Sequence, residues 1–270
     1  MENTMKHRPL AVITGASSGI GYELAKVFAK NGFDLIVAAE HSGIVDAGNA
    51  FRTLGASVET VQTDLATFDG VEALARKITE FGDRGIELDS ICMNAGFGVG
   101  GEFIGTDLQE EIKLINLNII SLVHLTKHVL PDFVKRGHGR ILFTSSLAAT
   151  MPGPWYACYA ASKAFVQSFA EAIRVETKDS GVTLTALQPG ATYTIFFERA
   201  DMVDTKAGQG KKDDPAEVAL DGFNALMAGR DHVVAGSIMN NIQAAAAKVM
   251  PQSQTAKMQG AFVKPGSGRE

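Results

Sequence analysis

The chain has 270 residues, with 25 Lys plus Arg against 30 Asp plus Glu, which gives a formal charge of −5. Apolar residues make up 46% and charged residues 20%, a globular mixture that excludes a disordered or collagen-like chain. The mild acidity, with no basic block longer than Lys211-Lys212, excludes a surface built to hold nucleic acid.

Short apolar runs rich in β-branched residues alternate with longer amphipathic runs, a pattern typical of a parallel sheet with helices on both faces. The predicted strands cover residues 10–14, 34–38, 57–63, 90–94, 140–145, 183–188 and 232–235. The predicted helices cover residues 19–30, 43–54, 67–81, 108–136, 156–178 and 215–227. We therefore predict a single α/β domain, residues 1–236, with a doubly wound Rossmann-type parallel sheet of about seven strands.

Two stretches interrupt the alternation. Residues 191–214 form a long connection with an apolar first half and a Gly/Lys-rich second half, and a connection of this length predicts a lid over a ligand site. Residues 237–270 are predicted to be a C-terminal helical extension, with an Ala-rich helix at 241–249 and a flexible tail.

The first strand runs into a glycine-rich turn with the spacing Gly-x-x-x-Gly-x-Gly, formed by Gly15, Gly19 and Gly21. Such a turn lets backbone amides approach a pyrophosphate, and the helix that follows adds its partial positive charge. The spacing differs from the general dinucleotide motif Gly-x-Gly-x-x-Gly. Taken alone, the turn is also compatible with a purely structural role.

Polar residues follow two further strands at the edge where open α/β sheets bind ligands. Asp64 follows the third strand and can accept a hydrogen bond from the exocyclic amine of adenine. Asn94 and Gly96 follow the fourth strand and can shape a cradle behind a cofactor. Each of these residues alone is also a common helix cap or turn former.

The fifth strand ends at Ser146, and Tyr159 and Lys163 follow on the next predicted helix. A spacing of four residues places Tyr159 and Lys163 on one helix face. An ammonium favours a neighbouring phenolate, so we expect Lys163, together with the charge of a bound cofactor, to lower the pKa of Tyr159 towards neutrality. Ser146 is then a donor for a substrate oxygen. The alternative is a chance Tyr/Lys pair on an ordinary amphipathic helix.

Asn116 and Asn118 interrupt an otherwise apolar run in the long helix 108–136. A buried amide is costly unless it is hydrogen-bonded, which predicts a specific role for at least one of them. One asparagine could hold a water that links a catalytic lysine to solvent. The alternatives are a helix kink or an interface contact.

Together these motifs, with a late Pro-Gly-x-x-x-Thr, resemble the short-chain dehydrogenase/reductase family in its compact single-domain form, over about residues 9 to 235. The resemblance implies an NAD(P)-dependent oxidoreductase that moves a hydride between nicotinamide and a ketone or secondary alcohol. It implies Tyr159 as general acid/base, Ser146 as the residue that orients the substrate oxygen, and Asn118, rather than Asn116, as the holder of the relay water. Lys163 would lower the pKa of Tyr159 and bind the nicotinamide ribose.

The resemblance also implies a set of cofactor-binding residues. For the pyrophosphate loop they are Gly15, Ser17, Gly19, Ile20 and Gly21; for adenine, Asp64 with Leu65; for the cradle, Asn94 and Gly96; and for the nicotinamide end, Tyr159, Lys163, Pro189, Gly190 and Thr194.

Cofactor choice depends on Glu40, which follows the second strand. In the family an acidic residue there favours NAD, because it accepts from a ribose hydroxyl and repels a 2′-phosphate, whereas NADP-preferring members carry an arginine nearby. No arginine stands in the glycine loop or directly after the strand, so NAD is preferred to NADP. His41 or Lys26 could still accept the phosphate.

Apolar side chains flank the expected site and predict a hydrophobic ketone or secondary alcohol as substrate; they are Phe97, Met151, Trp155, Tyr156, Tyr193, Phe196, Phe197 and Met202. Cys158, beside Tyr159, has no adjacent base and is expected to pack rather than react. One alternative function is an NAD(P)-binding regulator with little or no turnover. Another is an isomerase or dehydratase that uses transient oxidation.

The remaining expectations concern location and partners. Cys92 and Cys158 form no Cys-x-x-Cys or Cys/His cluster, and no apolar run approaches the ~20 residues of a membrane span. We therefore expect a soluble, cytoplasmic protein with no metal, membrane or nucleic-acid partner. Apolar faces on helices 108–136 and 156–178, together with the family resemblance, predict a homodimer or homotetramer.

Overall fold

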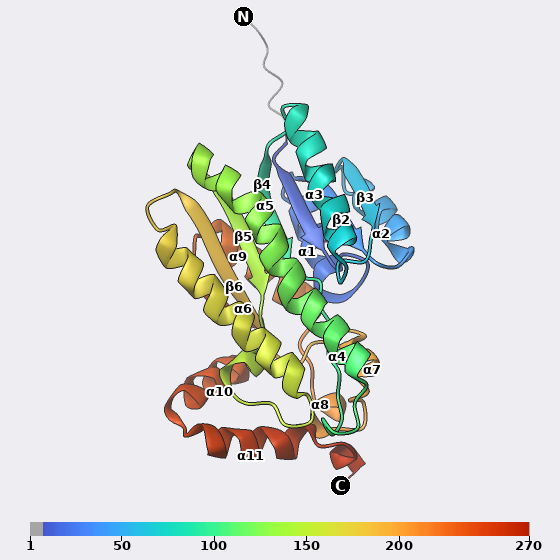
Figure 1. Cartoon of the computed structure of the whole chain (residues 1–270), viewed down its shortest axis with the longest axis vertical. Coiled ribbons are helices and arrows are strands. Elements are labelled where there is room, and N and C mark those ends of the chain that lie inside the picture. The colour runs from blue at the N-terminus through green and yellow to red at the C-terminus, as the bar shows by residue number, and fades with distance from the viewer. Residues whose placement is uncertain (1–7, 270) are drawn as a thin grey trace, which may run out of the picture.

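The computed structural model describes residues 8–269, apart from the side chain of residue 248, and contains a seven-stranded sheet (Figure 1). The strands are β1 Leu10–Thr14, β2 Asp34–Ala39, β3 Val58–Gln62, β4 Leu88–Met93, β5 Gly139–Thr144, β6 Val182–Pro189 and β7 His232–Ala235. They lie in the order β3-β2-β1-β4-β5-β6-β7, and every pair is parallel. The strand order reverses between β1 and β4, which is where open α/β sheets bind ligands.

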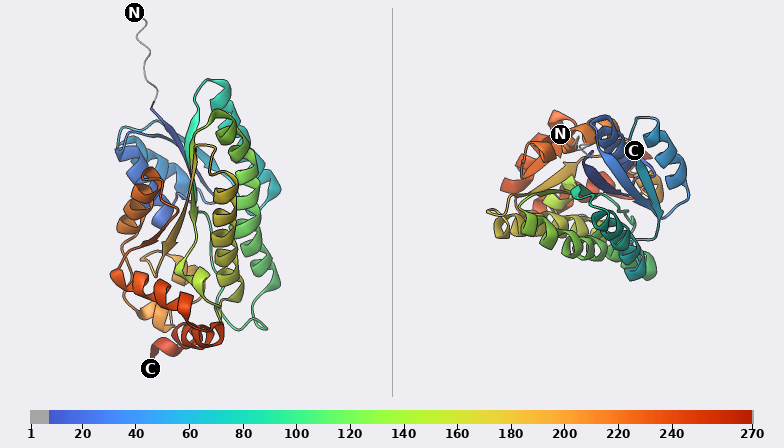
Figure 2. Two further views of the ribbon diagram at one scale, coloured as in Figure 1. Left: turned by 90° about the vertical axis from the view of Figure 1, so that its left-hand side faces the viewer. Right: turned by 90° about the horizontal axis from the view of Figure 1, so that it is seen from above.

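Helices cover both faces of the sheet (Figure 2), which confirms the predicted doubly wound single-domain fold. One face carries α1 Gly19–Lys30, α2 Gly43–Arg52 and α9 Pro215–Met227, and the other carries α3 Phe68–Asp83, α5 Ser121–Arg136 and α6 Ala157–Glu176.

Successive side chains of a strand point to opposite faces, so β1 contributes to both layers of the core. Ala11 and Ile13 pack with Phe28 of α1, and Val12 packs with Leu125 of α5. All five side chains are at most 1% exposed.

The predicted helix 108–136 is divided by a π-helical turn. Helix α4 spans Leu108–Ile115, the π turn spans Asn116–Ile120, and α5 follows directly. Asp107 caps α4 by accepting hydrogen bonds from two backbone amides of its first turn. Asn118 lies within this π turn, and its side chain is 2% exposed.

The segments outside the alternation carry four more helices, α7 Phe196–Arg199, α8 Lys206–Gln209, α10 Ile238–Val249 and α11 Gln252–Val263, and a 3₁₀ turn at Ser267–Arg269. The Ala-rich helix begins at Ile238 rather than at 241. Residues 252–263, expected to be part of an irregular tail, form α11. The 3₁₀ turn is hydrogen-bonded to residues 204 and 206, so the end of the chain packs beside α8.

Within residues 8–269, no helix has the length and hydropathy needed to cross a bilayer.

Candidate active site

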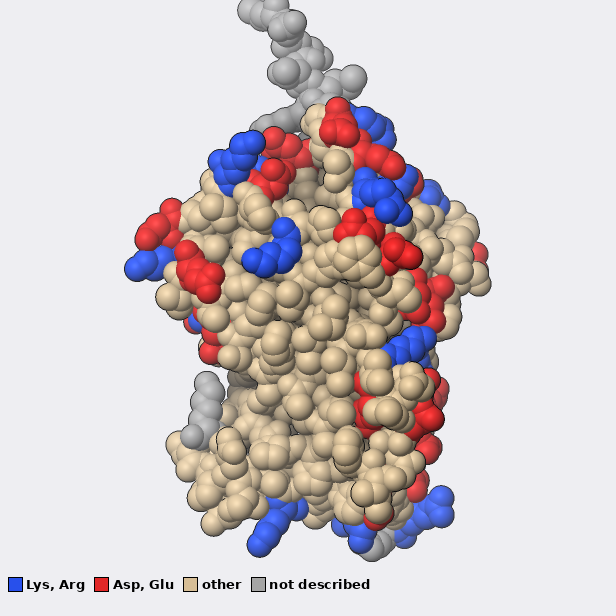
Figure 3. All heavy atoms as spheres, viewed as in Figure 1, with Lys and Arg blue, Asp and Glu red and all other residues tan. Residues whose placement is uncertain are grey.

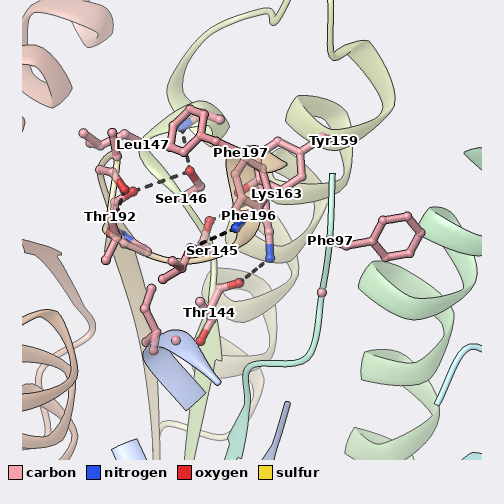
Figure 4. Close-up of a pocket in the computed structure, with 18 of the residues that line it drawn as sticks. Phe97, Thr144, Ser145, Ser146, Leu147, Tyr159, Lys163, Thr192, Phe196 and Phe197 are labelled. Atoms are coloured by element: carbon pink, nitrogen blue, oxygen red, sulfur yellow. Dashed lines mark hydrogen bonds between the residues drawn. The ribbon is translucent and has the colours of Figure 1, made fainter. Parts of the chain in front are cut away.

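A cavity of about 800 Å³ lies at the carboxyl ends of the strands, bounded by the loops that follow β1 to β6 and by α10 and α11 (Figure 4). Of the site residues proposed from the sequence, those that line it are Gly15, Ser17, Gly19, Ile20, Glu40, Asp64, Leu65, Asn94, Gly96, Ser146, Tyr159, Lys163, Pro189, Gly190 and Thr194. The two that do not, Gly21 and Asn118, lie directly behind lining residues. The loops thus bring together residues that are far apart in the sequence.

The glycine loop after β1 forms a cradle that side chains would fill. Gly15 and Gly19 have φ of 68° and 58°, in the region that favours glycine. A Cβ on Gly15 would lie 2.9 Å from the Cα of Ala95, and one on Gly21 would lie 2.2 Å from the carbonyl oxygen of Gly15. Ser18 begins α1 without a side-chain capping bond, which leaves first-turn amides available to an anion. This cradle fits the pyrophosphate of a dinucleotide.

Asn94 joins strands beneath the cradle. The backbone amides of Asn94 and Ala95 both donate to Thr14 Oγ1, at 2.9 and 3.0 Å. The Asn94 side chain donates to the Thr14 carbonyl at 3.2 Å and accepts from Thr144 Oγ1 at 3.2 Å. Asn94 therefore ties β1, β4 and β5 together and holds the floor of the cavity.

Tyr159 projects from the first turns of α6 towards Ser146, which lies at the end of β5. The Tyr159 ring packs against Phe196, with centroids 4.9 Å apart, and against Tyr156 at 5.8 Å. Burial raises the pKa of Tyr159 to about 12, and a hydrogen bond with Ser146 opposes the rise. In the protein alone, Tyr159 is therefore a protonated phenol at neutral pH.

Lys163 lies one turn further along α6 and is 5% exposed. Its ammonium donates to the Thr144 carbonyl at 2.9 Å (Figure 4) and lies 5.7 Å from the centroid of the Tyr159 ring. Burial lowers the pKa of Lys163 to about 8. Loss of hydration dominates the pKa of Tyr159 in the protein alone, and the expected lowering requires the charge of a bound cofactor in addition to Lys163.

Asn118 occupies a fixed position behind Gly96. Its amide nitrogen donates to the Phe97 carbonyl and to Ser162 Oγ, both at 3.0 Å, and its oxygen accepts from the Phe97 amide at 3.2 Å. A Cβ on Gly96 would lie 2.9 Å from Asn118 Oδ1 and 3.4 Å from Lys163 Nζ. Because Gly96 has no side chain, the Asn118 amide and the Lys163 ammonium can both lie next to it, with a small space between them.

Glu40, which lines the cavity after β2, forms an ion pair that was not predicted from the sequence. Glu40 Oε1 lies 3.0 Å from Lys113 Nζ of α4, and this bond lowers the pKa of Glu40. His41 lies 4.0 Å from the other Glu40 oxygen. Glu40 and Lys113 are 73 positions apart, so no local sequence pattern predicts that they form an ion pair. Lys26, suggested as a phosphate partner, instead pairs with Glu23 and does not line the cavity.

Asp64 lies on the same side of the cavity. Its carboxylate accepts from the Ala66 amide at 2.9 Å in the turn after β3. Asp64 and Leu65 both line the cavity wall.

The opposite end of the cavity is apolar. Six of the eight predicted apolar residues line it, namely Phe97, Met151, Tyr156, Phe196, Phe197 and Met202. Trp155 and Tyr193 do not, and Tyr193 is 62% exposed. Residues of α10 and α11, which the sequence analysis did not assign to the site, complete this end; they include Met239, Met250, Met258, Phe262 and Val263.

Asn240 of α10 lies against the Pro189-Gly190 segment at the end of β6. Its side chain donates to Asp213 at 2.7 Å and to the Ala235 carbonyl at 2.8 Å. A Cβ on Gly190 would lie 2.6 Å from Asn240 Oδ1. The glycine thus allows α10 to approach the Pro189-Gly190 segment closely.

Cys158 is half-buried beside Tyr159, and burial together with a hydrogen bond to Glu111 raises its pKa to about 11. A thiol in this state is a weak nucleophile at neutral pH, in keeping with a packing role.

Comparisons with known proteins agree with this geometry. The family model described as short chain dehydrogenase matches residues 9–202. The oxidoreductase UcpA of Salmonella typhimurium is 32% identical over 80% of this chain and 79% of its own, and dehydrogenase/reductase SDR family member 7B of Rattus norvegicus is 32% identical over 80% and 70%.

Among solved structures, a short-chain dehydrogenase from Sphingobium yanoikuyae in complex with NADPH superposes with a TM-score of 0.78. It is 28% identical, and the match covers 84% of this chain and 87% of that one. The sheet order, the cradle and these matches lead to one conclusion. The chain belongs to the short-chain dehydrogenase/reductase family and is an NAD(P)-dependent oxidoreductase.

Proposed function

We propose that the protein transfers a hydride between nicotinamide and a hydrophobic ketone or secondary alcohol, with Tyr159 as general acid/base. The observation that supports this most is the placement of Ser146, Tyr159 and Lys163 between the glycine cradle and an apolar wall that contains Phe196 and Phe197. This arrangement fits a cofactor bound along the loops that follow the strands, with the substrate carbonyl beside Tyr159. The complete Ser/Tyr/Lys set favours turnover over a purely regulatory role.

In carbonyl reduction, the Ser146 hydroxyl donates a hydrogen bond to the substrate oxygen and Tyr159 delivers the proton. In alcohol oxidation, Tyr159 takes the proton instead. When bound, the cofactor supplies the hydride or, in its oxidised cationic form, accepts it and favours the Tyr159 phenolate. The tyrosine of the protein alone, with a pKa of about 12, is in the form needed for reduction.

Lys163 and Asn118 replenish that proton in this proposal. Lys163 has a pKa of about 8, so it can lose and regain a proton near neutral pH. Asn118 Oδ1 faces the space beside Gly96 and Lys163 Nζ, where a water could accept a hydrogen bond from the lysine. The rigid bonds of Asn118 to Phe97 and Ser162 suit a residue that positions such a water.

We further propose that NAD is preferred to NADP, with Glu40 accepting from a ribose hydroxyl. Lys113 holds the Glu40 carboxylate ionised and in place, and at the same time weakens its repulsion of a 2′-phosphate. The expected preference is accordingly modest. Asp64 and Leu65 form the adenine wall in this arrangement.

Residues 191–214 are proposed to act as a lid over the substrate. Backbone hydrogen bonds join the two ends of the segment. The Tyr193 amide donates to the Asp213 carbonyl at 2.9 Å, and the Asp213 amide donates to the Ala191 carbonyl at 2.8 Å. Phe197 and Met202, between these ends, line the cavity. Closure of this segment would exclude water from the reacting atoms.

A homo-oligomer that packs through the outer faces of α4 to α6 is also proposed. Large apolar side chains exposed there include Leu108, Ile112, Ile120 and Phe165. Figure 3 shows that the centre of this face carries few charged side chains. Burial of such a face against a second copy is favourable because it removes apolar surface from water.

The substrate class is tested by steady-state reduction of a ketone series that ranges from small and charged to bulky and apolar, with NADH and NADPH in parallel. We expect kcat/KM to be highest for bulky apolar ketones. Phe262→Ser should raise KM for these by about tenfold and leave cofactor affinity unchanged, since Phe262 lines only the apolar end. Phe103→Ser, which alters an exposed residue away from the cavity, is the matched control. A preference for small charged ketones would contradict the proposal.

A further inference from the structure

The outer surface between α3 and α5 holds a cluster of two histidines and one glutamate, away from the catalytic cavity. His124 Nε2 lies 2.7 Å and His128 Nε2 lies 2.8 Å from the same oxygen of Glu72. One ligand atom from each of the three side chains lies within 4.8 Å of the other two. The oxidoreductase chemistry proposed above uses none of them.

The helix geometry explains why the two imidazoles converge. Residues 124 and 128 are four positions apart on α5, so they project from one face of the helix, and Glu72 reaches them from α3. Both Nε2–H groups donate to one carboxylate oxygen, so the three side chains already meet at one point.

The cluster is held in place before any ion arrives. The Phe68 ring stacks on His124 with centroids 4.6 Å apart and an interplanar angle of 28°. The two imidazole rings lie 5.1 Å apart, and the His124 side chain is only 18% exposed. Little side-chain freedom remains to be lost on binding, which favours affinity.

Only a small adjustment would convert these hydrogen bonds into metal bonds. Ligand atoms about 2.0–2.1 Å from one ion lie about 3 Å or slightly more apart, compared with the present 2.7 and 2.8 Å. Each imidazole would carry its proton on Nδ1 instead of Nε2, so that both Nε2 lone pairs and the Glu72 carboxylate meet at the ion. The His128 side chain is 38% exposed, so the remaining coordination positions face water.

We propose that Glu72, His124 and His128 form a binding site for a divalent transition-metal ion such as Zn²⁺, which clamps α3 to α5. Two imidazole nitrogens and one carboxylate oxygen are a set that zinc commonly uses, whereas Mg²⁺ and Ca²⁺ prefer oxygen ligands. Because the site lies on the outer surface, its expected effect is stabilisation of the fold rather than participation in hydride transfer.

The test is calorimetric titration of ZnCl₂ into the full chain, purified without a polyhistidine tag and stripped of metal, together with thermal unfolding with and without Zn²⁺. We expect one ion per chain and a higher Tm with Zn²⁺ but not with Mg²⁺. His128→Gln and Glu72→Gln should each weaken Zn²⁺ binding by at least roughly 10- to 100-fold, the loss seen when even an indirect metal partner is removed.

His138→Gln is the matched control, because His138 is another surface histidine that lies 3.6 Å from the Glu87 carboxylate. Within residues 8–269 it belongs to no cluster of three potential metal ligands. This variant should bind Zn²⁺ as the unaltered chain does. Circular dichroism of each variant shows that it is folded, and the exposed position of His128 makes its substitution the milder one. Absence of Zn²⁺ binding by the unaltered chain, or binding that survives both His128→Gln and Glu72→Gln, would overturn the proposal.

Discussion

At the scale of single residues, the burial of Lys163 lowers the stability of the folded protein at neutral pH, although the proposed mechanism requires this lysine. Its ammonium is buried, so the folded chain binds this proton less tightly than the unfolded chain does, with a pKa of about 8 instead of 10.5. Below pH 8 the folded protein must therefore hold an unfavourable buried charge. Between pH 8 and 10.5 the unfolded chain keeps a proton that the folded chain has lost, so stability rises with pH over this window.

Lys163→Met should consequently make the protein more stable at pH 7, by about 1 to 3 kcal/mol, while abolishing most activity. The gain should shrink as the pH approaches 10, because the unaltered lysine then folds uncharged. Urea unfolding of both proteins at pH 7 and pH 10 measures this. A variant that is less stable than the original at pH 7 would show that the buried charge is compensated by contacts of the ammonium.

The Glu40–Lys113 pair is the proposed determinant of cofactor preference at the same scale. Glu40→Ala should shift the ratio of NADH to NADPH affinity towards NADPH, because the carboxylate that repels the 2′-phosphate is gone. Lys113→Met should shift it towards NADH, because the repulsion is then no longer weakened. Both shifts are expected to be about 3- to 30-fold, which corresponds to about 1–2 kcal/mol.

Calorimetric Kd values for NADH and NADPH measure these ratios. Lys77→Met is a suitable control, since Lys77 is also paired with carboxylates but lies on α3 away from the cavity. If both Glu40→Ala and Lys113→Met left the ratio unchanged, the pair would have no part in cofactor choice.

At the scale of elements, the π turn and the loop after β4 depend on each other. The turn presents Asn118 to the Phe97 backbone, and Gly96 leaves the room that this contact requires. Gly96→Ala would force its Cβ against Asn118 Oδ1 and Lys163 Nζ. We expect a loss of about 1–3 kcal/mol in unfolding free energy and a clear fall in kcat, measured by urea unfolding and steady-state kinetics.

Gly82→Ala is the matched control for that substitution. Its Cβ would meet nothing within 4 Å, and Gly82 lies within α3, so alanine should stabilise the protein slightly. If Gly96→Ala behaved like Gly82→Ala, the close packing around Asn118 would be unimportant for both folding and activity.

The same elements show how far sequence reasoning reaches. The alternation of apolar runs predicted all seven strands, because a parallel strand leaves a compositional signal within four to eight residues. The π turn could not be predicted, since residues 114–125 keep a helical pattern throughout. Helix α11 was missed because few of its side chains are apolar, and its burial at Gly260 and Val263 depends on distant segments.

The candidate site was predictable where its residues lie at strand ends or four apart on one helix. Fifteen of the proposed residues line one cavity, although their roles there stay predictions. Two features of the site arise only from tertiary packing and were not predicted: the ion pair between Lys113 and Glu40, and the lining of the apolar end by residues of α10 and α11. The lowering of the Tyr159 pKa by Lys163 and a bound cofactor stays a prediction, and the spacing gave no measure of the ring's burial, which raises that pKa in the protein alone.

At the scale of the whole molecule, the cavity is built from two regions of the chain. The family model matches residues 9–202, which supply the cradle and the Ser/Tyr/Lys set. Helices α10 and α11 lie beyond that match and close the apolar end, at the bottom of the view in Figure 1. We therefore expect the C-terminal helices to decide which ketone is accepted, while the matched region determines the chemistry.

The central claim is that Tyr159 exchanges the proton during hydride transfer. The most direct measurement is stopped-flow NAD(P)H oxidation with the preferred ketone by Tyr159→Phe, after calorimetry has shown that the variant binds its cofactor as the unaltered protein does. Removal of the phenolic proton should lower the rate by about 10²- to 10⁴-fold without loss of cofactor affinity. A rate within twofold of the original would contradict the proposed mechanism.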